Sequence, residues 1–187
     1  WRKAAVWRAD LGGIQGVALF VDLDSVIVDD LTPFFEFGDP NGVILARNWL
    51  KPFSKLGQTT LFRFKVGAQR YLLEDFQKDP QGVAERFQFE QHYVTKSVRG
   101  GVRFWPNAWV KHYRVHCLPG YIGRYFRPAV LPKGARVIAF PGEPNPADAL
   151  VGQWTNGAPV TAKTHFFNLL NPERRLHKSW RGHFCCF

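Results

Sequence analysis

Apolar and polar positions along the first half of the chain follow strand-like and helix-like patterns in turn. Val17–Val21 is a short apolar run of strand-forming residues, which is typical of a buried strand. Thr59–Lys65 alternates apolar and polar residues and predicts a second strand. Residues 70–76 place their apolar side chains at helical spacing and predict a helix. Strands that alternate with helices favour an α/β sheet.

Shorter segments extend this pattern to about residue 150. Thr32-Pro33 predicts a helix start, with Thr32 as the N-cap and Pro33 at the first helical position. The other expected elements are the end of a helix at 1–10, extended segments at 25–28, 104–106 and 109–113, strands at 43–46 and 135–140, and helices at 83–87, 90–99 and 147–150. Asp79–Gly82 is expected to interrupt the helical region.

Two aspartates directly follow the first predicted strand. Asp22 and Asp24 are two positions apart, so on an extended strand they share a face, with Leu23 on the opposite face. Two like charges in that position are unfavourable unless a cation lies between them, and a hard divalent cation prefers oxygen ligands. Open α/β sheets bind their ligands at this end of the strands. The pair predicts a metal–phosphate site, and the alternative is an acidic loop, because short Asp-x-Asp patterns are common.

Composition and charge narrow the class of protein. The 187 residues are 45% hydrophobic and 21% charged, which fits one globular domain with a sizeable core. No apolar run approaches the ~20 residues that cross a bilayer, and the start shows no signal-peptide pattern. Three irregularly spaced cysteines form no disulfide framework, so we expect a cytoplasmic protein, with Cys117 as a small core residue.

The basic character of the chain points to anionic partners. The net charge is +10, which suits nucleotide diphosphates or anionic lipid headgroups. No zinc-finger spacing and no aromatic motif of the RNP type occurs, so we expect no nucleic-acid partner. A basic RNA-binding protein remains an alternative that a salt-dependent electrophoretic shift would reveal.

Five motifs, in a fixed order, resemble those of a known family. They are Leu19–Asp24 with Val28–Leu31, Gly57–Phe64, Glu90–Val94, Phe104–Pro106 and Val137–Pro146. Together they resemble bacterial glycosyltransferases of the GT-A fold, most closely those distantly related to the glycogenin-like family 8. The resemblance implies an α/β, Rossmann-like mixed sheet flanked by helices over residues 1–154. Residues 155–187 are then expected to form a basic, aromatic tail or a peripheral helix.

The resemblance also implies a function and a set of site residues. It implies metal-dependent transfer of a sugar from a nucleotide diphosphate donor to a hydroxyl acceptor. Asp22 and Asp24 would hold Mn²⁺ or Mg²⁺ against the donor diphosphate. Gln58 stands where relatives commonly carry Asn beside the donor sugar. Gln91, preceded by Glu90 in place of the usual acid, stands where relatives have an acidic-Gln pair that faces the reacting sugar.

Partners and location follow from the same resemblance. The implied partners are a nucleotide-sugar donor and a glycan or lipid-linked acceptor. The basic run Arg174–Lys178 is most often a solvated face. Its alternative is peripheral contact with an anionic membrane, since many such enzymes act on lipid-linked or surface glycans.

The chain departs from the family pattern in two places. Pro141 occupies the position where relatives usually carry a His that completes the metal coordination, and proline cannot ligate. Water or Glu143 could fill that place, and His112 and His165 are further candidates. The family's first strand and base pocket normally lie upstream of Trp1, so we expect an N-terminally truncated fold that lacks the first βαβ unit. A catalytically impaired, transferase-like binding or structural remnant is therefore the alternative.

Other residues able to carry chemistry have simpler interpretations. His112 and His116 would form a metal pair on a helix, but residues 109–116 are more typical of a strand. Trp49 and Trp105 could stack on a sugar face, with core packing as the favoured alternative.

Overall fold

The computed structural model describes the chain except for residues 1, 52, 120–128 and 152–187. The chain divides into two compact units. Unit 1 comprises Trp1–Val21 and Leu31–Asn107, and unit 2 comprises Asp22–Asp30 and Ala108–Phe187. The predicted tail over 155–187 lies outside the described residues, so it stays a prediction.

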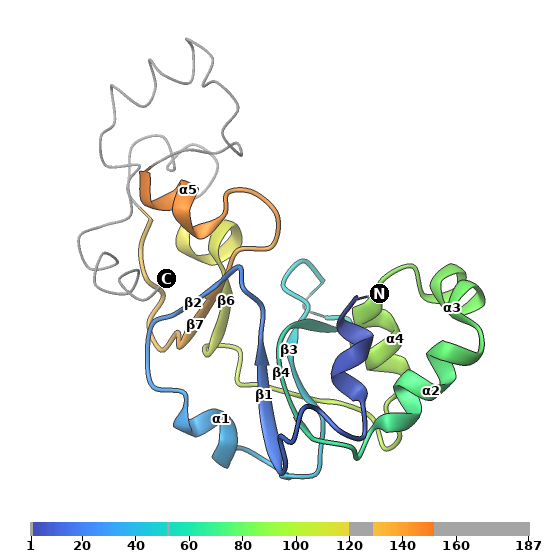
Figure 1. The fold of residues 1–187 in the computed structure, drawn as a ribbon. Helices are drawn as coiled ribbons and strands as arrows, with labels where there is room; N and C mark the ends of the chain where they lie inside the picture. The colour runs from blue at the N-terminus through green and yellow to red at the C-terminus, as the bar shows by residue number, and fades with distance from the viewer. Residues whose placement is uncertain (1, 52, 120–128, 152–187) are drawn as a thin grey trace. The chain divides into compact units, whose positions relative to one another are not determined.

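Unit 1 is a four-stranded mixed sheet with helices around it (Figure 1). Its elements are the 3-10 helix η1 (Arg2–Trp7), β1 (Val17–Val21), α1 (Thr32–Glu36), β3 (Ile44–Arg47), β4 (Gly57–Lys65), α2 (Arg70–Lys78), α3 (Pro80–Phe87), α4 (Glu90–Ser97) and β5 (Arg103–Phe104). The strand order is β1-β4-β3-β5. β4 pairs antiparallel with β1 and β3, and β3 pairs parallel with β5.

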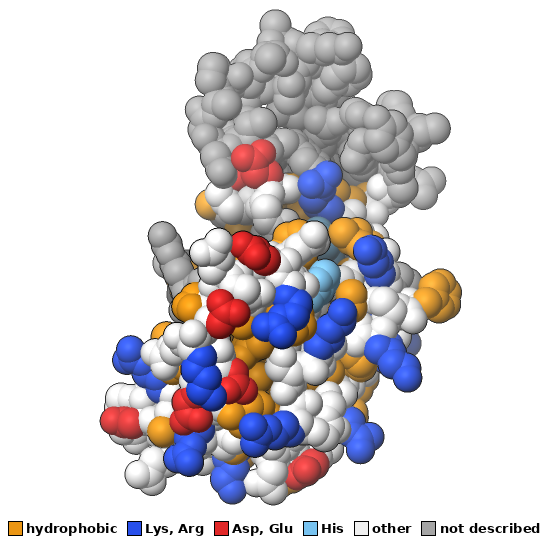
Figure 2. All heavy atoms as spheres, turned by 90° about the vertical axis from the view of Figure 1, so that its right-hand side faces the viewer, with side chains coloured by type: hydrophobic (Ala, Val, Ile, Leu, Met, Phe, Trp, Pro, Cys, Tyr) orange, Lys and Arg blue, Asp and Glu red, His pale blue; other side chains and the backbone are white. Residues whose placement is uncertain are grey.

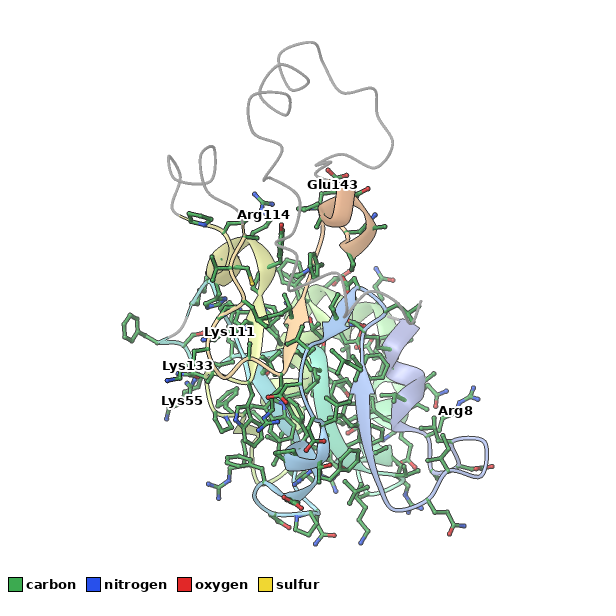
Figure 3. All side chains as sticks on the ribbon, turned by 90° about the vertical axis from the view of Figure 1, so that its left-hand side faces the viewer. Arg8, Lys55, Lys111, Arg114, Lys133 and Glu143 are labelled. Carbon is green, nitrogen blue, oxygen red and sulfur yellow. The ribbon has the colours of Figure 1, made fainter. Side chains whose placement is uncertain are left out.

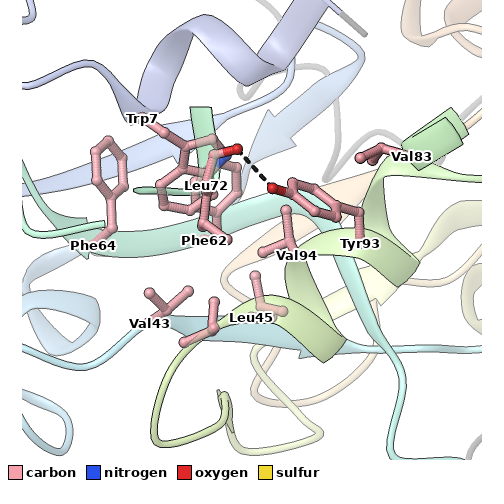
Figure 4. Packing of buried hydrophobic residues seen from close by; sticks show 10 residues of the cluster. Trp7, Val43, Leu45, Phe62, Phe64, Leu72, Val83, Tyr93 and Val94 are labelled. Carbon is pink, nitrogen blue, oxygen red and sulfur yellow. Dashed lines mark hydrogen bonds between the residues drawn. The ribbon is translucent and has the colours of Figure 1, made fainter. Parts of the chain in front are cut away.

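One face of β4 forms the main core of unit 1 (Figure 4). The Trp7 ring of η1 stacks on Phe62 with 5.2 Å between centroids and meets Phe64 edge-on at 5.2 Å. The Tyr93 hydroxyl of α4 donates a hydrogen bond of 2.7 Å to the Leu72 carbonyl of α2. A buried hydroxyl with its partner adds specificity to an otherwise apolar contact. Helices from three parts of unit 1 therefore cover this face of the sheet.

The opposite face of β4 is also buried, which an alternating strand pattern does not predict. Arg63 is fully buried there, and its guanidinium donates to the carbonyls of Phe34 and Phe35 at 3.0 Å each and to the carbonyl of Asp39. Burial lowers the pKa of Arg63 from its usual value, and the charge of Asp39 opposes that effect. Arg63 thus ties the end of α1 and the following loop to the centre of the sheet.

The described residues of unit 2 form a three-stranded sheet with two short helices. Its elements are β2 (Ser25–Ile27), β6 (Val110–His112), the π-helical turn η2 (Tyr113–Cys117), β7 (Val137–Ala139) and α5 (Pro146–Val151). The central strand β7 pairs antiparallel with β2 and parallel with β6. Ala139 lies opposite both Ser25 and His112, so the start of β2 and the ends of β6 and β7 share one edge of this sheet. Tyr113 and Phe140 stack beside it with 4.4 Å between ring centroids.

The prediction of a mixed α/β fold is confirmed, with differences in detail. Leu31, not Thr32, is the N-cap of α1, and it makes no side-chain capping bond. Asp79 separates α2 from α3, as expected, but the interruption is one residue long, because Pro80–Gly82 already belong to α3. The Asp79 side chain caps α3, accepting a hydrogen bond of 2.9 Å from the Gly82 amide. Residues 113–117 form a helical turn where a strand was expected, because the chain leaves the sheet after His112.

Charged side chains are scattered, and not concentrated in one patch, on the face of the molecule that Figure 2 shows. On the face of the molecule shown in Figure 2, Lys and Arg side chains lie among Asp, Glu and apolar side chains. In the part of the chain that the structure describes, no helix is both long and apolar enough to cross a membrane.

Candidate functional site

Asp22 and Asp24 lie in the turn between β1 and β2, not on an extended strand. β1 ends at Val21, and the intervening Leu23 is 95% exposed. The prediction that strand pleating aligns the two carboxylates is therefore wrong in its geometry. The physical reason is pairing: the chain leaves the hydrogen bonds of β1 at Val21 and enters those of β2 at Ser25, and residues 22–24 make the change of sheet.

A backbone hydrogen bond fixes the position of Asp24 within unit 2. The Phe140 amide donates to the Asp24 carbonyl at 2.8 Å, one step beyond the paired Ser25 and Ala139. Pro141 follows directly and starts the turn after β7. One carboxylate oxygen of Asp24, Oδ1, is buried. The acidic turn and the turn after β7 are therefore neighbours at one edge of the sheet.

The turn after β7 is held by contacts on both sides. Gly142 has φ +81°, a left-handed conformation that favours glycine, and the side where a Cβ would stand is open space. The Glu143 carbonyl accepts a hydrogen bond of 3.4 Å from Nη1 of Arg114 (Figure 3). Asn145 and Asp148 cap each other at the start of α5, with N–H···O distances of 2.9 and 3.2 Å.

His112 and His116 lie close together at the same edge of unit 2. Nδ1 of His112 accepts a hydrogen bond of 3.1 Å from the Arg114 amide, and Nδ1 of His116 lies 3.0 Å from the His112 amide. Burial, and then the nearby His116 and Arg114, lowers the pKa of His112 to about 4. Burial also lowers the pKa of His116. Both imidazoles are therefore neutral at pH 7, and His112 uses one ring nitrogen inside the turn.

The residues predicted to contact the sugar belong to unit 1. Gln58 is the second residue of β4, and Glu90 and Gln91 open α4; all three are half-buried. Thr95 connects these two elements. Its hydroxyl accepts from the Gly57 amide at 3.0 Å and donates to the Gln91 carbonyl at 2.6 Å. The beginning of β4 is thus fixed beside the first turns of α4. Gln58 therefore lies at the start of a strand, and Glu90 and Gln91 at the start of a helix, that are joined through Thr95.

This close approach depends on glycine at position 57. A Cβ on Gly57 would stand 2.4 Å from Cδ1 of Leu45 and 3.2 Å from Oγ1 of Thr95. Any other residue would therefore push β4 away from β3 and α4. Neither Gly57 nor Thr95 was predicted as a site residue. A lone glycine at a strand start and a threonine four positions after Gln91 were the only signals available in the sequence.

Burial decides between the alternatives for Trp105 and for Cys117. Trp105 is 3% exposed and meets Phe34 edge-on at 4.9 Å, so it packs in the core and is closed to a sugar. Trp49, the other candidate, is half-buried. Burial raises the pKa of the Cys117 thiol to about 12, which fits the predicted core role and makes this thiol a poor nucleophile.

The acidic pair suits a divalent cation by its chemistry. Mg²⁺ and Mn²⁺ prefer carboxylate oxygens, and Mg²⁺ commonly takes one or two carboxylates together with substrate phosphates and water. Asp22 and Asp24 supply two such groups, and Pro141 supplies none. Within the described ranges 2–51, 53–119 and 129–151, no three His, Cys, Asp or Glu side chains come together to hold a metal ion. The pair therefore fits a cation that is bound jointly with a phosphate ligand.

Comparisons with known proteins find likeness in structure and not in sequence. No protein-family model and no curated protein matches the chain. The galactosyltransferase LgtC, solved in complex with donor and acceptor sugar analogues, is similar at a TM-score of 0.55 and 16% identity, over 98% of this chain and 70% of that chain. An active-site mutant of LgtC is similar at a TM-score of 0.55 and 15% identity, over 98% and 71%. The chain therefore has a mixed α/β, GT-A-like fold of the kind found in LgtC.

Proposed function

We propose that this chain transfers a sugar from a nucleotide diphosphate donor to a hydroxyl group of a glycan or lipid-linked acceptor. One observation carries the proposal: the hydrogen bond from Phe140 to the Asp24 carbonyl, which seats the acidic turn beside the turn after β7. This arrangement occurs in a fold like that of a galactosyltransferase solved with donor and acceptor sugar analogues. The likeness in fold supports the reaction class, and the acidic turn supports the donor class.

The acidic turn would act on the leaving group. Held by Asp22 and Asp24, Mn²⁺ or Mg²⁺ would supply positive charge to the diphosphate as its bond to the sugar breaks. The two carboxylates would set the place of that charge. The hydrogen bond from the Phe140 amide to the Asp24 carbonyl would help to keep the turn in position for this role.

Three polar residues of unit 1, Gln58, Glu90 and Gln91, would contact the sugar. The side-chain amides of Gln58 and Gln91 both donate and accept hydrogen bonds, which suits the hydroxyl groups of a sugar. Glu90 can accept from a hydroxyl of the donor or the acceptor. Thr95 restrains the backbone of Gln91 and so limits the directions open to its side chain. A glutamine replaced by glutamate is the active-site change in one LgtC structure, which supports a glutamine in this role.

A second candidate is a non-catalytic binding module with the transferase scaffold. Pro141 favours it, because this position contributes no metal ligand beside the acidic turn. The described residues also bring no third acidic, His or Cys side chain to the pair. Such a module would keep the fold and lose cation-dependent binding of a nucleotide diphosphate.

The substitution Asp24→Ala tests the proposal, with Leu23→Ala as the matched control. Leu23 lies in the same turn but is 95% exposed, so its removal leaves the carboxylates and the core intact. Calorimetry with UDP, GDP and ADP in the presence of Mn²⁺ should show binding by the parent chain and Leu23→Ala. Asp24→Ala should bind at least ~10-fold more weakly, since a carboxylate ligand contributes on the order of a charge-assisted contact.

Thermal shift gives an independent measurement. A ligand at 100 times its Kd stabilises the folded state by about 2.7 kcal/mol, so a competent site raises Tm with Mn²⁺ and a nucleotide diphosphate. Unchanged binding by Asp24→Ala would remove the acidic pair from the mechanism. A parent chain that binds none of the three nucleotides would support the non-catalytic module.

A further inference from the structure

We propose that Arg114 binds the diphosphate of the donor and compensates part of its negative charge. This role rests on the proposed function, because it concerns the same ligand. The sequence pattern did not predict a role for Arg114, and the proposal rests on its position in unit 2.

The topology of unit 2 puts Arg114 at the edge that carries the acidic turn. Arg114 is the second residue of η2, directly beyond β6. The end of β6 lies beside the end of β7 through the pair His112 and Ala139. The next residue after Ala139 donates its amide to the Asp24 carbonyl. Arg114 and Asp24 therefore flank the turn after β7, one from each neighbouring strand.

Contacts within unit 2 hold Arg114 in place on both its backbone and its side chain. Its amide donates to Nδ1 of His112 at 3.1 Å, and Nη1 donates to the Glu143 carbonyl at 3.4 Å. Figure 3 shows Arg114 and Glu143 at the same end of the ribbon. The π-helical turn that carries Arg114 is a rare local structure that often occurs at functional sites. The side chain is exposed, so an approaching anion can reach it.

The guanidinium keeps its charge and most of its donors. The Glu143 carbonyl is a neutral acceptor, so this contact cancels no positive charge. A guanidinium has five N–H donors in a planar fork that matches the oxygens of phosphate. A diphosphate could thus accept two parallel hydrogen bonds without displacing the contact that positions the side chain.

Charge balance explains why such a group is needed at this edge. Two aspartates and one divalent cation sum to zero net charge, so they leave the charge of the diphosphate uncompensated. Pro141 adds neither a ligand nor a charge. Arg114 supplies one positive charge on the other side of the same turn. It therefore complements the acidic pair and does not compete with it.

The experiment compares Arg114→Gln and Arg114→Lys with Lys133→Gln, an exposed cation of unit 2 outside the proposed site. The probes are UDP, GDP and ADP, titrated with Mn²⁺ at two salt concentrations, and the three nucleosides without phosphate. Arg114→Gln should weaken binding of the nucleoside diphosphates about tenfold, as expected for a charge-assisted contact. Arg114→Lys should lie between it and the parent chain, because lysine keeps the charge and loses the fork. Lys133→Gln should bind the nucleoside diphosphates as tightly as the parent chain does. The affinity for the nucleosides should be the same in all variants.

The outcomes separate this inference from the proposed function. If the parent chain binds a nucleoside diphosphate and Arg114→Gln binds it equally well, Arg114 has no role and the proposed function stands. If the parent chain binds none of them, the proposed function itself is overturned and the role of Arg114 with it. Circular dichroism reports whether Arg114→Gln is folded. Should it be unfolded, Arg114→Lys decides, and an affinity equal to that of the parent chain overturns the proposal.

Discussion

Thr95→Val removes the hydroxyl that joins the start of β4 to α4. In the parent chain this hydroxyl accepts from the Gly57 amide at 3.0 Å and donates to the Gln91 carbonyl at 2.6 Å. Valine has almost the same shape as threonine, so the packing is kept and only the polar group is lost. The Gly57 amide belongs to a buried residue and is left without this acceptor in the variant.

The expected cost follows from that single unpaired group. A buried donor that loses its acceptor costs about 1–3 kcal/mol, so we expect Thr95→Val to lower the free energy of unfolding by about 2 kcal/mol. For a chain of this length, 1 kcal/mol corresponds to about 2–4 °C, which gives a fall in Tm of about 4–8 °C. A water molecule has little room to replace the lost acceptor, because Leu45 and Thr95 already lie so close to Gly57 that a Cβ there would meet both.

Urea and thermal unfolding, followed by far-UV circular dichroism, measure this cost. Thr95→Ser is the control, since serine keeps the hydroxyl and loses only a methyl group, which costs about 0.8 kcal/mol when buried. The stability should therefore fall in the order parent, Thr95→Ser, Thr95→Val. A Thr95→Val variant that is as stable as Thr95→Ser would refute the argument that the hydroxyl bridge holds α4 against β4.

Two further predictions concern buried groups away from this bridge. The pKa of His112 is about 4 when folded against an ordinary value of 6.5, so the unfolded chain binds the proton more tightly. The contribution of neutral His112 to the free energy of unfolding is therefore fully present above pH 6.5, and up to about 3 kcal/mol of it is lost as the pH falls from 6.5 through 4. His112→Gln should flatten this pH dependence in unfolding curves measured from pH 7 to 4. Arg63→Met keeps the packing of the side-chain stem but removes the donors to the carbonyls of Phe34, Phe35 and Asp39. We expect it to cost about 3 kcal/mol by urea unfolding, with Arg63→Lys recovering only part, and a loss below about 1 kcal/mol would contradict the anchoring role.

The candidate site was partly predictable because its residues stand out locally. Asp22 and Asp24 follow an apolar strand, and the predicted strand Val17–Val21 agrees with the observed β1. Gln91 was proposed from the resemblance to a family motif and not from any pattern in the residues. Arg114 was not among the residues that the sequence suggested, since the role proposed for it rests on contacts such as the hydrogen bond to Glu143, 29 positions away. Local patterns report short-range preferences and carry no information on such a pair.

The sequence alone determined the alternation of strands and helices and therefore the mixed α/β class. Periodicity of 2 or about 3.6 residues is a property of the local chain, and it survives whatever the tertiary arrangement is. The tertiary structure decided the rest. It paired β2 with β7 across more than a hundred positions, divided the strands between two sheets, and buried Arg63 on the face of β4 that alternation would leave to water. Those outcomes depend on which distant segments exclude water from each other, and only the folded chain fixes that choice.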